Sequence, residues 1–280
     1  MMPSQPDVSS RQNPRFKAAL ALRDARERRD RRRILVDGAR EIGRALDAGV
    51  PLVEAWVAPD RVRSEAARAL LPRLAASGEL IETTAELLAR LAYGERDEGV
   101  VAVLEMPATG LDGLRLPASP LLAVVEGVEK PGNLGALLRS ADGAGVDAVI
   151  VADAISDTWN PNAIRASLGT IFSLPLVSCT AAEALAYLQA RGLSILAARV
   201  EGQTEYDAAD LTRPLALVVG AETSGLSTVW SGAGVTAISI PMLGVADSLN
   251  VSASAAVLFY EARRQRRAAD RAADRATPAS

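Results

Sequence analysis

"LLAVVEGVEKPGNLGALLRSADGAG", residues 121–145, is the stretch that decides the fold. An apolar run ends in a loop with proline and glycine, and a helical pattern follows at once. An apolar strand that leads directly into a helix is typical of a parallel sheet, in which helices connect successive strands. Further apolar runs alternate with helical patterns, at 147–153, 194–200, 215–220 and 237–242. The sequence therefore predicts an α/β domain with a mostly parallel sheet.

A second, smaller α/β domain is predicted upstream. Short strand patterns at 34–36, 52–58, 79–84 and 98–107 alternate with helical ones. A segment rich in proline and glycine then separates the two domains. We expect a basic N-terminal extension at 1–33, with residues 1–10 disordered and one helix over 14–33. The small domain follows at 34–107, a linker at 108–119, the larger domain at 120–268 and a disordered tail at 269–280.

The composition removes several classes of chemistry. The 280 residues include no histidine and one cysteine, Cys179. Catalysis through Ser-His-Asp or Cys-His groups, histidine-ligated zinc and thiolate metal clusters are therefore excluded. We assign Cys179 a structural role. The apolar runs are too short to span a membrane, and the polar start does not resemble a signal peptide, so we expect a cytoplasmic protein.

Positive charge is concentrated near the N-terminus although the formal net charge is −3. Residues 11–33 hold ten basic side chains against three acidic ones. Such a segment is typical of RNA or DNA binding. A solvated helix with ion pairs three or four residues apart has the same composition, so this pattern leaves both readings open.

Polar residues gather where three of the apolar strands end. Ligands bind beyond the carboxyl ends of the strands in open α/β sheets, so these loops are the expected site. The candidates are Glu129, Lys130, Asn133, Arg139, Glu222, Thr223, Ser224, Asp247, Ser248 and Asn250. Helix capping is the alternative role for these residues. Asn133 would be the N-cap of one helix, and Ser248 the N-cap of another, with Asn250 at its second position. Glu222 would lie near a helix N-terminus, where its negative charge interacts favourably with the helix dipole.

Known nucleotide-binding motifs do not explain the first of these loops. Gly132 and Gly135 give G-x-x-G in place of the dinucleotide fingerprint G-x-G-x-x-G. Asp153 does lie about twenty residues further on, as that fingerprint requires. The phosphate-binding pattern G-x-x-x-x-G-K-[ST] is absent as well. Only one of the two features of the dinucleotide fingerprint is present, so a dinucleotide site is a weak alternative.

"NLGALLRSADGAG", "VVGAETSGLS" and "SIPMLGVADSLNVSASAAVLFYE" together resemble the three ordered motifs of the TrmH/SpoU family of RNA 2′-O-ribose methyltransferases, of the SPOUT class. The resemblance covers about residues 121–265 and implies a deep trefoil knot in the larger domain. Residues 34–60 resemble the family's ribosomal-L30e-like substrate-binding domain. Residues 10–33 are similar to the basic lead-in of its rRNA-directed branch, which includes antibiotic-resistance 23S rRNA methylases.

The resemblance implies S-adenosylmethionine as the methyl donor, a ribose 2′-hydroxyl as the acceptor, and no metal. By motif position, the catalytic group comprises Asn133, Arg139, Glu222, Ser248 and Asn250. The family's cofactor positions correspond to Ala198, Arg199, Gly220, Ile240 and Leu249, and glycine at 220 would let adenosine approach the backbone. Arg139 either takes the proton of the 2′-hydroxyl or binds the phosphate and stabilises the alkoxide.

The resemblance also implies partners. RNA, most directly rRNA, would contact Arg31, Arg32, Arg33 and Arg165, although a surface ion pair is an equal alternative for Arg165. Family members form homodimers through the knot domains. A tRNA ribose methylase and an RNA-binding module without activity remain alternatives. The sequence does not identify the nucleotide, or distinguish housekeeping modification from protection against an antibiotic.

Overall fold

The structure is a computed structural model that describes residues 6–93, 98–221 and 224–276. Contacts between Cα atoms divide the chain into two compact units. Unit 1 comprises Met1–Ala108 and Trp159–Ser173, and unit 2 comprises Thr109–Thr158 and Leu174–Ser280. The segment 159–173 therefore belongs to unit 1, although it interrupts unit 2 in the sequence.

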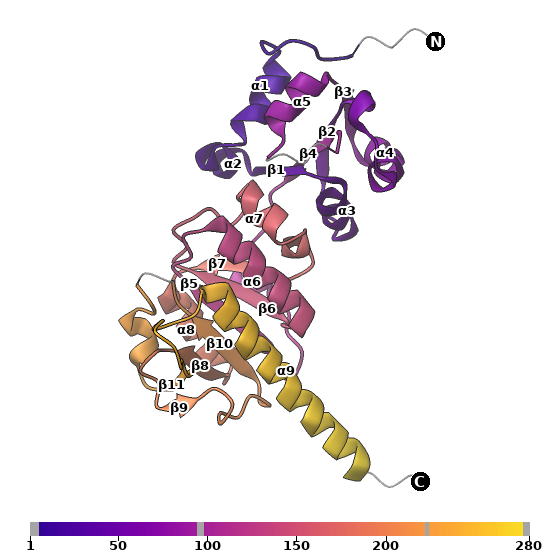
Figure 1. Ribbon diagram of the computed structural model, residues 1–280. Helices are drawn as coiled ribbons and strands as arrows, with labels where there is room; N and C mark the ends of the chain where they lie inside the picture. The colour runs from indigo at the N-terminus through magenta and orange to yellow at the C-terminus, as the bar shows by residue number, and fades with distance from the viewer. Residues whose placement is uncertain (1–5, 94–97, 222–223, 277–280) are drawn as a thin grey trace. The chain divides into compact units, whose positions relative to one another are not determined.

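Unit 1 is the predicted small α/β domain (Figure 1). Its strands form a sheet in the order β1-β4-β2-β3, in which β4 runs antiparallel to both neighbours and β2 pairs in parallel with β3. The elements are α1 (Pro14–Ala21), α2 (Ala25–Arg31), β1 (Arg33–Asp37), α3 (Ala39–Asp47), β2 (Leu52–Val57), α4 (Glu65–Ser77), β3 (Glu79–Glu82), α5 (Ala85–Leu91), β4 (Val100–Glu105) and α7 (Pro161–Ala166).

The basic N-terminal segment forms two helices that pack into unit 1. The expected single helix breaks after Ala21, and the Asp24 side chain caps α2 by accepting from the backbone N–H groups of Arg26 and Glu27. Phe16 is buried and meets the ring of Trp56 edge-on, with 6.1 Å between the centroids. Val8, in the part expected to be disordered, is buried and its N–H donates to the Glu82 carbonyl. Burial of these apolar side chains makes the segment part of the core.

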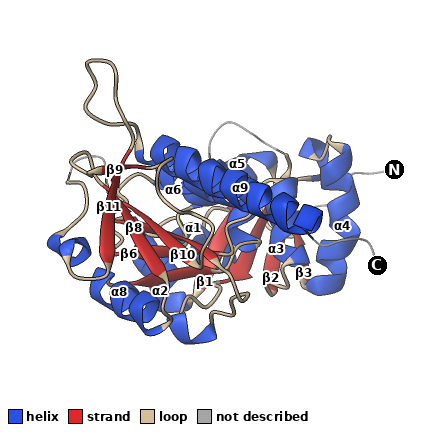
Figure 2. Ribbon diagram, turned by 90° about the horizontal axis from the view of Figure 1, so that it is seen from below, coloured by secondary structure: helices blue, strands red, loops and turns tan. Residues whose placement is uncertain are grey.

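Unit 2 contains the predicted parallel sheet, with seven strands in the order β7-β6-β5-β10-β8-β11-β9. Every neighbouring pair is parallel. The helices α6 and α9 lie side by side over one face of the sheet, and α8 covers the other (Figure 2). The elements are β5 (Leu121–Glu126), α6 (Pro131–Ala144), β6 (Ala148–Ala152), β7 (Leu176–Cys179), α8 (Ala181–Ala190), β8 (Ser194–Ala198), β9 (Thr204–Glu205), β10 (Leu215–Val219), β11 (Val235–Ser239) and α9 (Val251–Ala276).

The strand order places a site at the middle of this sheet. From β5 the chain proceeds outward through β6 to β7, whereas β8, β9 and β11 lie beyond β10 on the other side. The direction in which the chain proceeds across the sheet therefore reverses between β5 and β10. Crevices at such a point, beyond the carboxyl ends of the strands, are where open α/β sheets bind ligands. The knot stays a prediction of the resemblance.

The predicted linker packs in part against unit 2, and part of the predicted disordered tail is helical. Leu114 of the proposed linker is buried against the core of unit 2. The helix α9 runs to Ala276, so the segment from residue 269 is helical that far rather than disordered. Its alanine and arginine content explains the difference, since both residues favour helix even without tertiary contacts.

Candidate active site and cofactor pocket

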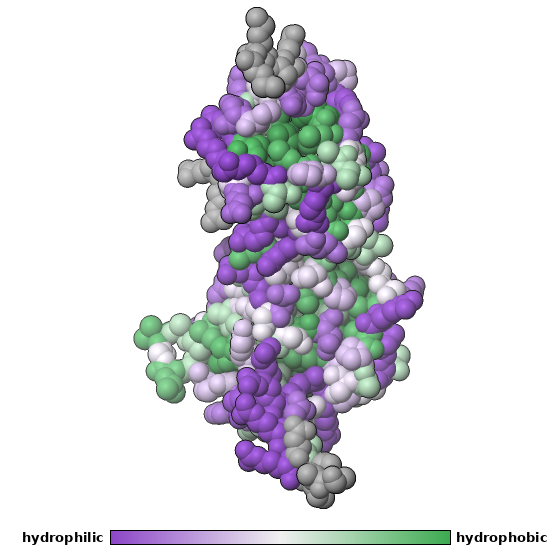
Figure 3. Space-filling model, turned by 90° about the vertical axis from the view of Figure 1, so that its right-hand side faces the viewer, coloured by the Kyte–Doolittle hydropathy of each residue, from purple (hydrophilic) through white to green (hydrophobic). Residues whose placement is uncertain are grey.

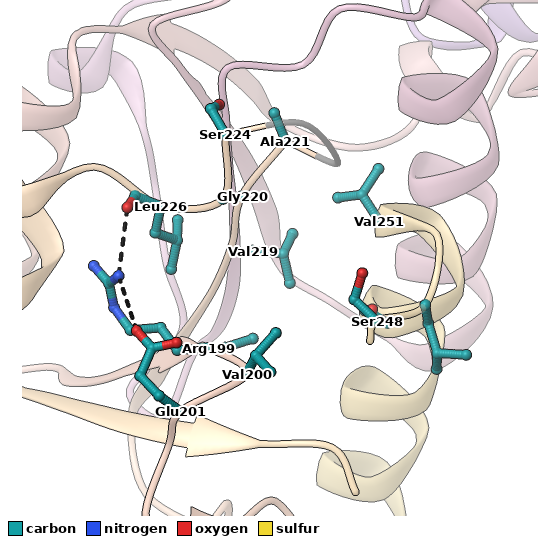
Figure 4. A pocket seen from close by; sticks show the side chains of 14 residues that line it. Arg199, Val200, Glu201, Val219, Gly220, Ala221, Ser224, Leu226, Ser248 and Val251 are labelled. Carbon is teal, nitrogen blue, oxygen red and sulfur yellow. Dashed lines mark hydrogen bonds and ion pairs between the residues drawn. The ribbon is translucent and has the colours of Figure 1, made fainter. Parts of the chain in front are cut away.

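Two adjoining cavities, of about 340 and 390 Å3, open at the carboxyl ends of β8, β10 and β11 in unit 2. Cavities of this size suit a small-molecule ligand. Figure 4 shows the first, between the ends of β8 and β10 and the start of α9. Both are lined by Ala198, Arg199, Val200, Ser248, Leu249 and Ser254; Gly220 lines the first, and Ile240 the second. The structure thus brings all five predicted cofactor residues around one continuous space.

Gly220 starts a tight turn that forms one wall of the first cavity. A Cβ atom on Gly220 would lie 2.3 Å from the backbone carbon of Gly225, which no side chain tolerates. The turn closes through a bridge between Ala221 and Gly225, whose φ of 63° favours glycine. The need for glycine at 220 therefore comes from the loop's own backbone, whereas the sequence suggested close approach by the ligand.

Glu126 and Arg199 hold the far end of this turn. Glu126, the last residue of β5, is 5% exposed and accepts hydrogen bonds from the Ser227 backbone N–H at 2.8 Å and hydroxyl at 2.7 Å. Arg199, just after β8, donates to the carbonyl oxygens of Leu226 and Ser227 at 3.4 and 2.8 Å. A buried carboxylate is stable only with such donors, so this pair of contacts fixes the loop firmly.

The role of Glu126 was not predicted. It stands at the end of an otherwise apolar strand, which is the signal that would have identified it. Arg199 lines both cavities, but its guanidinium is directed to the loop carbonyls and to Glu201 (Figure 4). Arg199 therefore stabilises the pocket wall through its contacts with other groups of the protein.

Asn133 and Asn250 lie next to each other where α6 and α9 begin. The Asn250 Nδ2 donates to Asn133 Oδ1 at 3.4 Å. Asn250 directly precedes α9, and its Oδ1 accepts from the backbone N–H of Ser252 at 3.0 Å, which is the geometry of an N-cap. The alternative that Ser248 caps this helix is therefore wrong. Asn133 is not the cap of α6 either, because that helix begins at Pro131.

The remaining predicted catalytic residues are divided. Ser248 lines both cavities. Arg139 is exposed on α6, about 9 Å along the helix from Asn133, and is not among the residues that line either cavity. Glu222 lies outside the described residues. The structure therefore groups the cofactor positions with Ser248, and places Arg139 on the outer surface of the same domain.

The predicted RNA contacts all lie in unit 1. Arg31 pairs with Glu27 at 2.7 Å, and Arg32 and Arg33 are exposed at the junction of α2 and β1. Arg165 on α7 donates to Asp37 at 2.7 Å, with side chains 22% and 6% exposed. Burial raises the pKa of Asp37, and Arg165 opposes that rise. The guanidinium of Arg165 thus has a partner inside unit 1.

Some basic side chains of residues 11–33 form ion pairs within unit 1, and others remain exposed. Arg11 pairs with Glu86, and Arg15 bridges Glu54 and Glu79. Among the described residues, Arg29 and Arg33 form no ion pair and are exposed. Part of the positive charge therefore stabilises the unit, and part remains on its surface.

The described part of the chain holds neither a metal-ligand cluster nor a membrane-spanning helix. Within it, no three histidine, cysteine, aspartate or glutamate side chains are grouped as a metal site would require. None of its helices is both long enough and apolar enough to cross a bilayer. Burial raises the pKa of the Cys179 thiol to about 11, aided by the charges of Glu183 and Asp153.

Comparison with known families decides the classification. The model of the SpoU rRNA methylase family matches residues 120–260, which include every predicted cofactor and catalytic position. The chain belongs to the SpoU rRNA methylase family. A model of the MRM3-like substrate binding domain matches residues 13–102. That match begins before α1, so the basic helices fall within the family's substrate-binding domain rather than in a separate extension at 1–33.

Relatives of this SpoU chain match it over two thirds of its length or more. It is 36% identical over 274 residues to the 23S rRNA (uridine(2479)-2'-O)-methyltransferase of Streptomyces viridochromogenes, covering 94% of each chain. It is 38% identical over 199 residues to the 23S rRNA (guanosine-2'-O-)-methyltransferase RlmB of Ralstonia nicotianae, covering 69% of this chain and 79% of that one.

Solved structures of SpoU enzymes share the fold. The structure of the SpoU methyltransferase AviRb from Streptomyces viridochromogenes with AdoMet superposes with a TM-score of 0.85 at 34% identity, covering 91% of this chain and 98% of that one. The crystal structure of an RNA 2'-O ribose methyltransferase superposes with a TM-score of 0.81 at 40% identity, covering 92% of this chain and 98% of that one.

Proposed function

We propose that this SpoU-family chain transfers a methyl group from S-adenosylmethionine to the 2′-hydroxyl of one ribose in 23S rRNA. The observation that carries the proposal is the cavity pair at the carboxyl ends of β8, β10 and β11, lined by the five positions expected to hold the cofactor. The relatives named for 23S rRNA 2′-O-methylation, and the AdoMet complex of AviRb, support the same substrates.

The residues around the cavities suit this cofactor. The backbone groups of Ile240 and Leu249 form no hydrogen bond with the described residues, so their N–H and C=O groups remain available to an adenosine moiety. Apolar side chains such as Val219 and Leu226 complete the walls. When bound, the cofactor supplies a methyl group already activated on a sulfonium, so no metal is needed.

The polar residues beside the pocket would orient the acceptor. Asn133 and Asn250 present amide groups at the starts of α6 and α9, close to the turn that begins at Gly220. Holding the ribose against the pocket supplies the alignment that a displacement at carbon requires. Arg139, a protonated guanidinium, would bind the phosphate next to the target and stabilise the developing alkoxide. A protonated guanidinium cannot accept a further proton, so the proton of the 2′-hydroxyl leaves to solvent.

The exposed position of Arg139 suits an acceptor that approaches from outside the domain. It also suits a homodimer, in which a second copy completes the site, and we propose that the protein acts as such a dimer in the cytoplasm. Unit 1 would bind the RNA through its phosphates. The contacting side chains would be the exposed arginines that adjoin one another at the end of α2: Arg29, Arg31, Arg32 and Arg33. Arg165 would contact RNA only if a phosphate replaced Asp37 as the partner of its guanidinium.

Two assays test the proposal together. Calorimetric titration with S-adenosylmethionine tests the pocket, and transfer of a tritiated methyl group to 23S rRNA tests the reaction. A Gly220→Ala variant places a Cβ against the backbone of Gly225 and should lose cofactor binding. Gly113→Ala makes the same substitution elsewhere in unit 2, at a position that lines neither cavity and where a Cβ meets no atom within 4 Å, and is the matched control. Unchanged cofactor binding in both variants would refute the assigned pocket.

A further inference from the structure

The last turns of α9 carry a set of arginines that the active site does not use. Its deepest side chains are Val251, Ala255, Leu258, Phe259 and Ala262, and from Arg267 onward every side chain that the structure describes is exposed. The helix continues past the edge of the sheet in unit 2 (Figure 1). A stretch of helix that buries no apolar side chain contributes little to the core, so its composition calls for another explanation.

The arginines of this stretch fall on one face. Arg263, Arg267, Arg271 and Arg275 recur every fourth residue, which keeps them in one row along a helix. At 3.6 residues per turn this row lies roughly opposite the buried row. An open groove of about 470 Å3 runs along it, lined by Tyr260, Arg263, Arg264, Arg267, Ala268 and Arg271. Figure 3 shows hydrophilic surface gathered around this end of α9.

The charge of this stretch is opposite to that of the rest of the chain. Residues 263–276 contain six arginines and two aspartates, a net of +4, so the remaining residues sum to −3 − 4 = −7. Asp270 lies beside the arginine row rather than within it, by its spacing along the helix. The positive field is therefore concentrated on one face.

Three of these arginines are held by neighbouring groups of unit 2. Arg266 is partly buried and donates to the carbonyl oxygens of Leu211, Ser119, Pro120 and Arg213. Arg264 pairs with Glu261 at 2.7 Å, and Arg263 donates to the Gly143 carbonyl at 3.0 Å. Among the described residues, Arg267 and Arg271 form no hydrogen bond or ion pair. Arg266 thus anchors the helix, while the next turns present unpaired guanidinium groups.

We propose that this face, the α9 arginine face, binds the phosphate backbone of the substrate RNA. It is defined by Tyr260, Arg263, Arg264, Arg267 and Arg271. Guanidinium groups bind phosphate oxygens with two parallel hydrogen bonds, and their planar shape limits the entropy lost for each bond formed. Tyr260 is 52% exposed in the same groove and offers a ring on which a base or ribose can stack.

The inference rests on the proposed RNA substrate and adds a second contact surface, in the methyltransferase domain itself. A contact there would hold RNA near the domain that carries the cofactor pocket, whereas α1 and α2 hold it through unit 1. Because the arginines read the backbone and not the bases, they contribute affinity and position without selecting the nucleotide.

The test uses the full chain with both Arg267→Gln and Arg271→Gln. The control variant carries Arg115→Gln and Arg191→Gln, which remove the same charge from exposed positions elsewhere in unit 2. Binding to a 23S rRNA transcript is measured from about 50 to 200 mM salt, a range over which phosphate contacts weaken steeply. The slope of log affinity against log salt should fall by about 2 in the test variant and change less in the control.

Methyl transfer provides the second measurement. KM for RNA should rise in the test variant while kcat at saturating RNA and cofactor affinity stay as in the unaltered chain. Equal salt slopes for the two variants would overturn the inference. A halved mass in sedimentation, seen only in the test variant, would assign the face to a contact between two copies and would also overturn it. The proposed function fails separately, if the unaltered chain binds RNA but transfers no methyl group.

Discussion

The carboxylate of Glu126 holds Ser227 by two hydrogen bonds, at 2.8 Å from its N–H and 2.7 Å from its hydroxyl. These residues come from segments 101 positions apart, at the end of β5 and in the loop after β10. From the other side, Arg199 donates to the Ser227 carbonyl. The loop that forms a wall of the proposed cofactor pocket is thereby fixed by two charged side chains at the ends of β5 and β8, the strands on either side of β10.

Glu126→Gln should weaken cofactor binding. The amide keeps the shape of the side chain but offers one acceptor in place of two, so one donor of Ser227 loses its partner. Loss of a hydrogen bond to a charged group costs about 1.5–3 kcal/mol, which corresponds to roughly a tenfold or greater change in an equilibrium constant.

Calorimetry on the variants checks this expectation. Ser227→Ala, which loses only the hydroxyl contact, should show a smaller effect than Glu126→Gln, and kcat at saturating cofactor should change little in both. Identical cofactor affinity for Glu126→Gln and the unaltered chain would show that the loop is held without this contact.

Arg139→Ala should abolish methyl transfer and leave cofactor binding intact, because Arg139 lies outside both cavities. Loss of one electrostatic stabiliser of this kind lowers kcat by about 100-fold or more. Arg139→Lys keeps the charge without the two-pronged geometry and should recover only part of the activity. Near-normal turnover of Arg139→Ala would remove this residue from the mechanism.

Much of the architecture could be predicted because its strands are continuous apolar runs. β5, β6, β8 and β10 fall within predicted segments, since burial on both faces leaves an unbroken apolar pattern. β11 begins two residues before its predicted segment and ends inside it. The two-residue strand β9 at the sheet edge has no such pattern, because it extends over only Thr204–Glu205. The break between α1 and α2 was also missed, because its cap Asp24 stands among charged residues that suit a continuous helix.

The residues expected to hold the cofactor line the cavities, but the contacts inside the candidate site were not predicted. Motif resemblance located Gly220, Ile240 and Leu249, and all three line the cavities. The contact of Glu126 with Ser227 depends on which strands are neighbours, and β5 and β10 are far apart in sequence. The pairing of Arg165 with Asp37 requires knowing that the segment 159–173 packs with unit 1.

Arg165→Gln should destabilise unit 1 by about 3 kcal/mol at neutral pH, because it leaves the carboxylate of Asp37 buried without its cation. Burial already raises the pKa of Asp37, and loss of Arg165 raises it further. The folded state therefore binds the Asp37 proton more tightly than the unfolded state. The destabilisation should shrink as pH falls towards the range in which Asp37 is protonated.

Denaturant unfolding of the variant at several pH values measures this dependence. The double variant with Asp37→Asn and Arg165→Gln removes the buried charge and should recover part of the loss at pH 7. A destabilisation that does not vary with pH would contradict a buried, charge-dependent pair. If Arg165 instead contacts RNA, the single variant should lower the salt slope of RNA binding by about 1.

Cys179 should react slowly with thiol reagents in the folded protein. A pKa of about 11 leaves roughly one-hundredth of the thiolate that an unperturbed thiol of pKa 9.0 has at pH 8. Because the chain has a single cysteine, the colour released by a disulfide reagent reports on this site alone. The rate should rise about 100-fold in denaturant; equal rates in the folded and unfolded chain would contradict the assigned environment.

The most direct test of the central claim is to map 2′-O-methylation on 23S rRNA after incubation with the protein and S-adenosylmethionine. We predict one methylated ribose, absent when the cofactor is omitted and absent with Arg139→Ala. A protein that binds the cofactor and the rRNA but adds no methyl group, or adds it to a base in place of a ribose, would contradict the account.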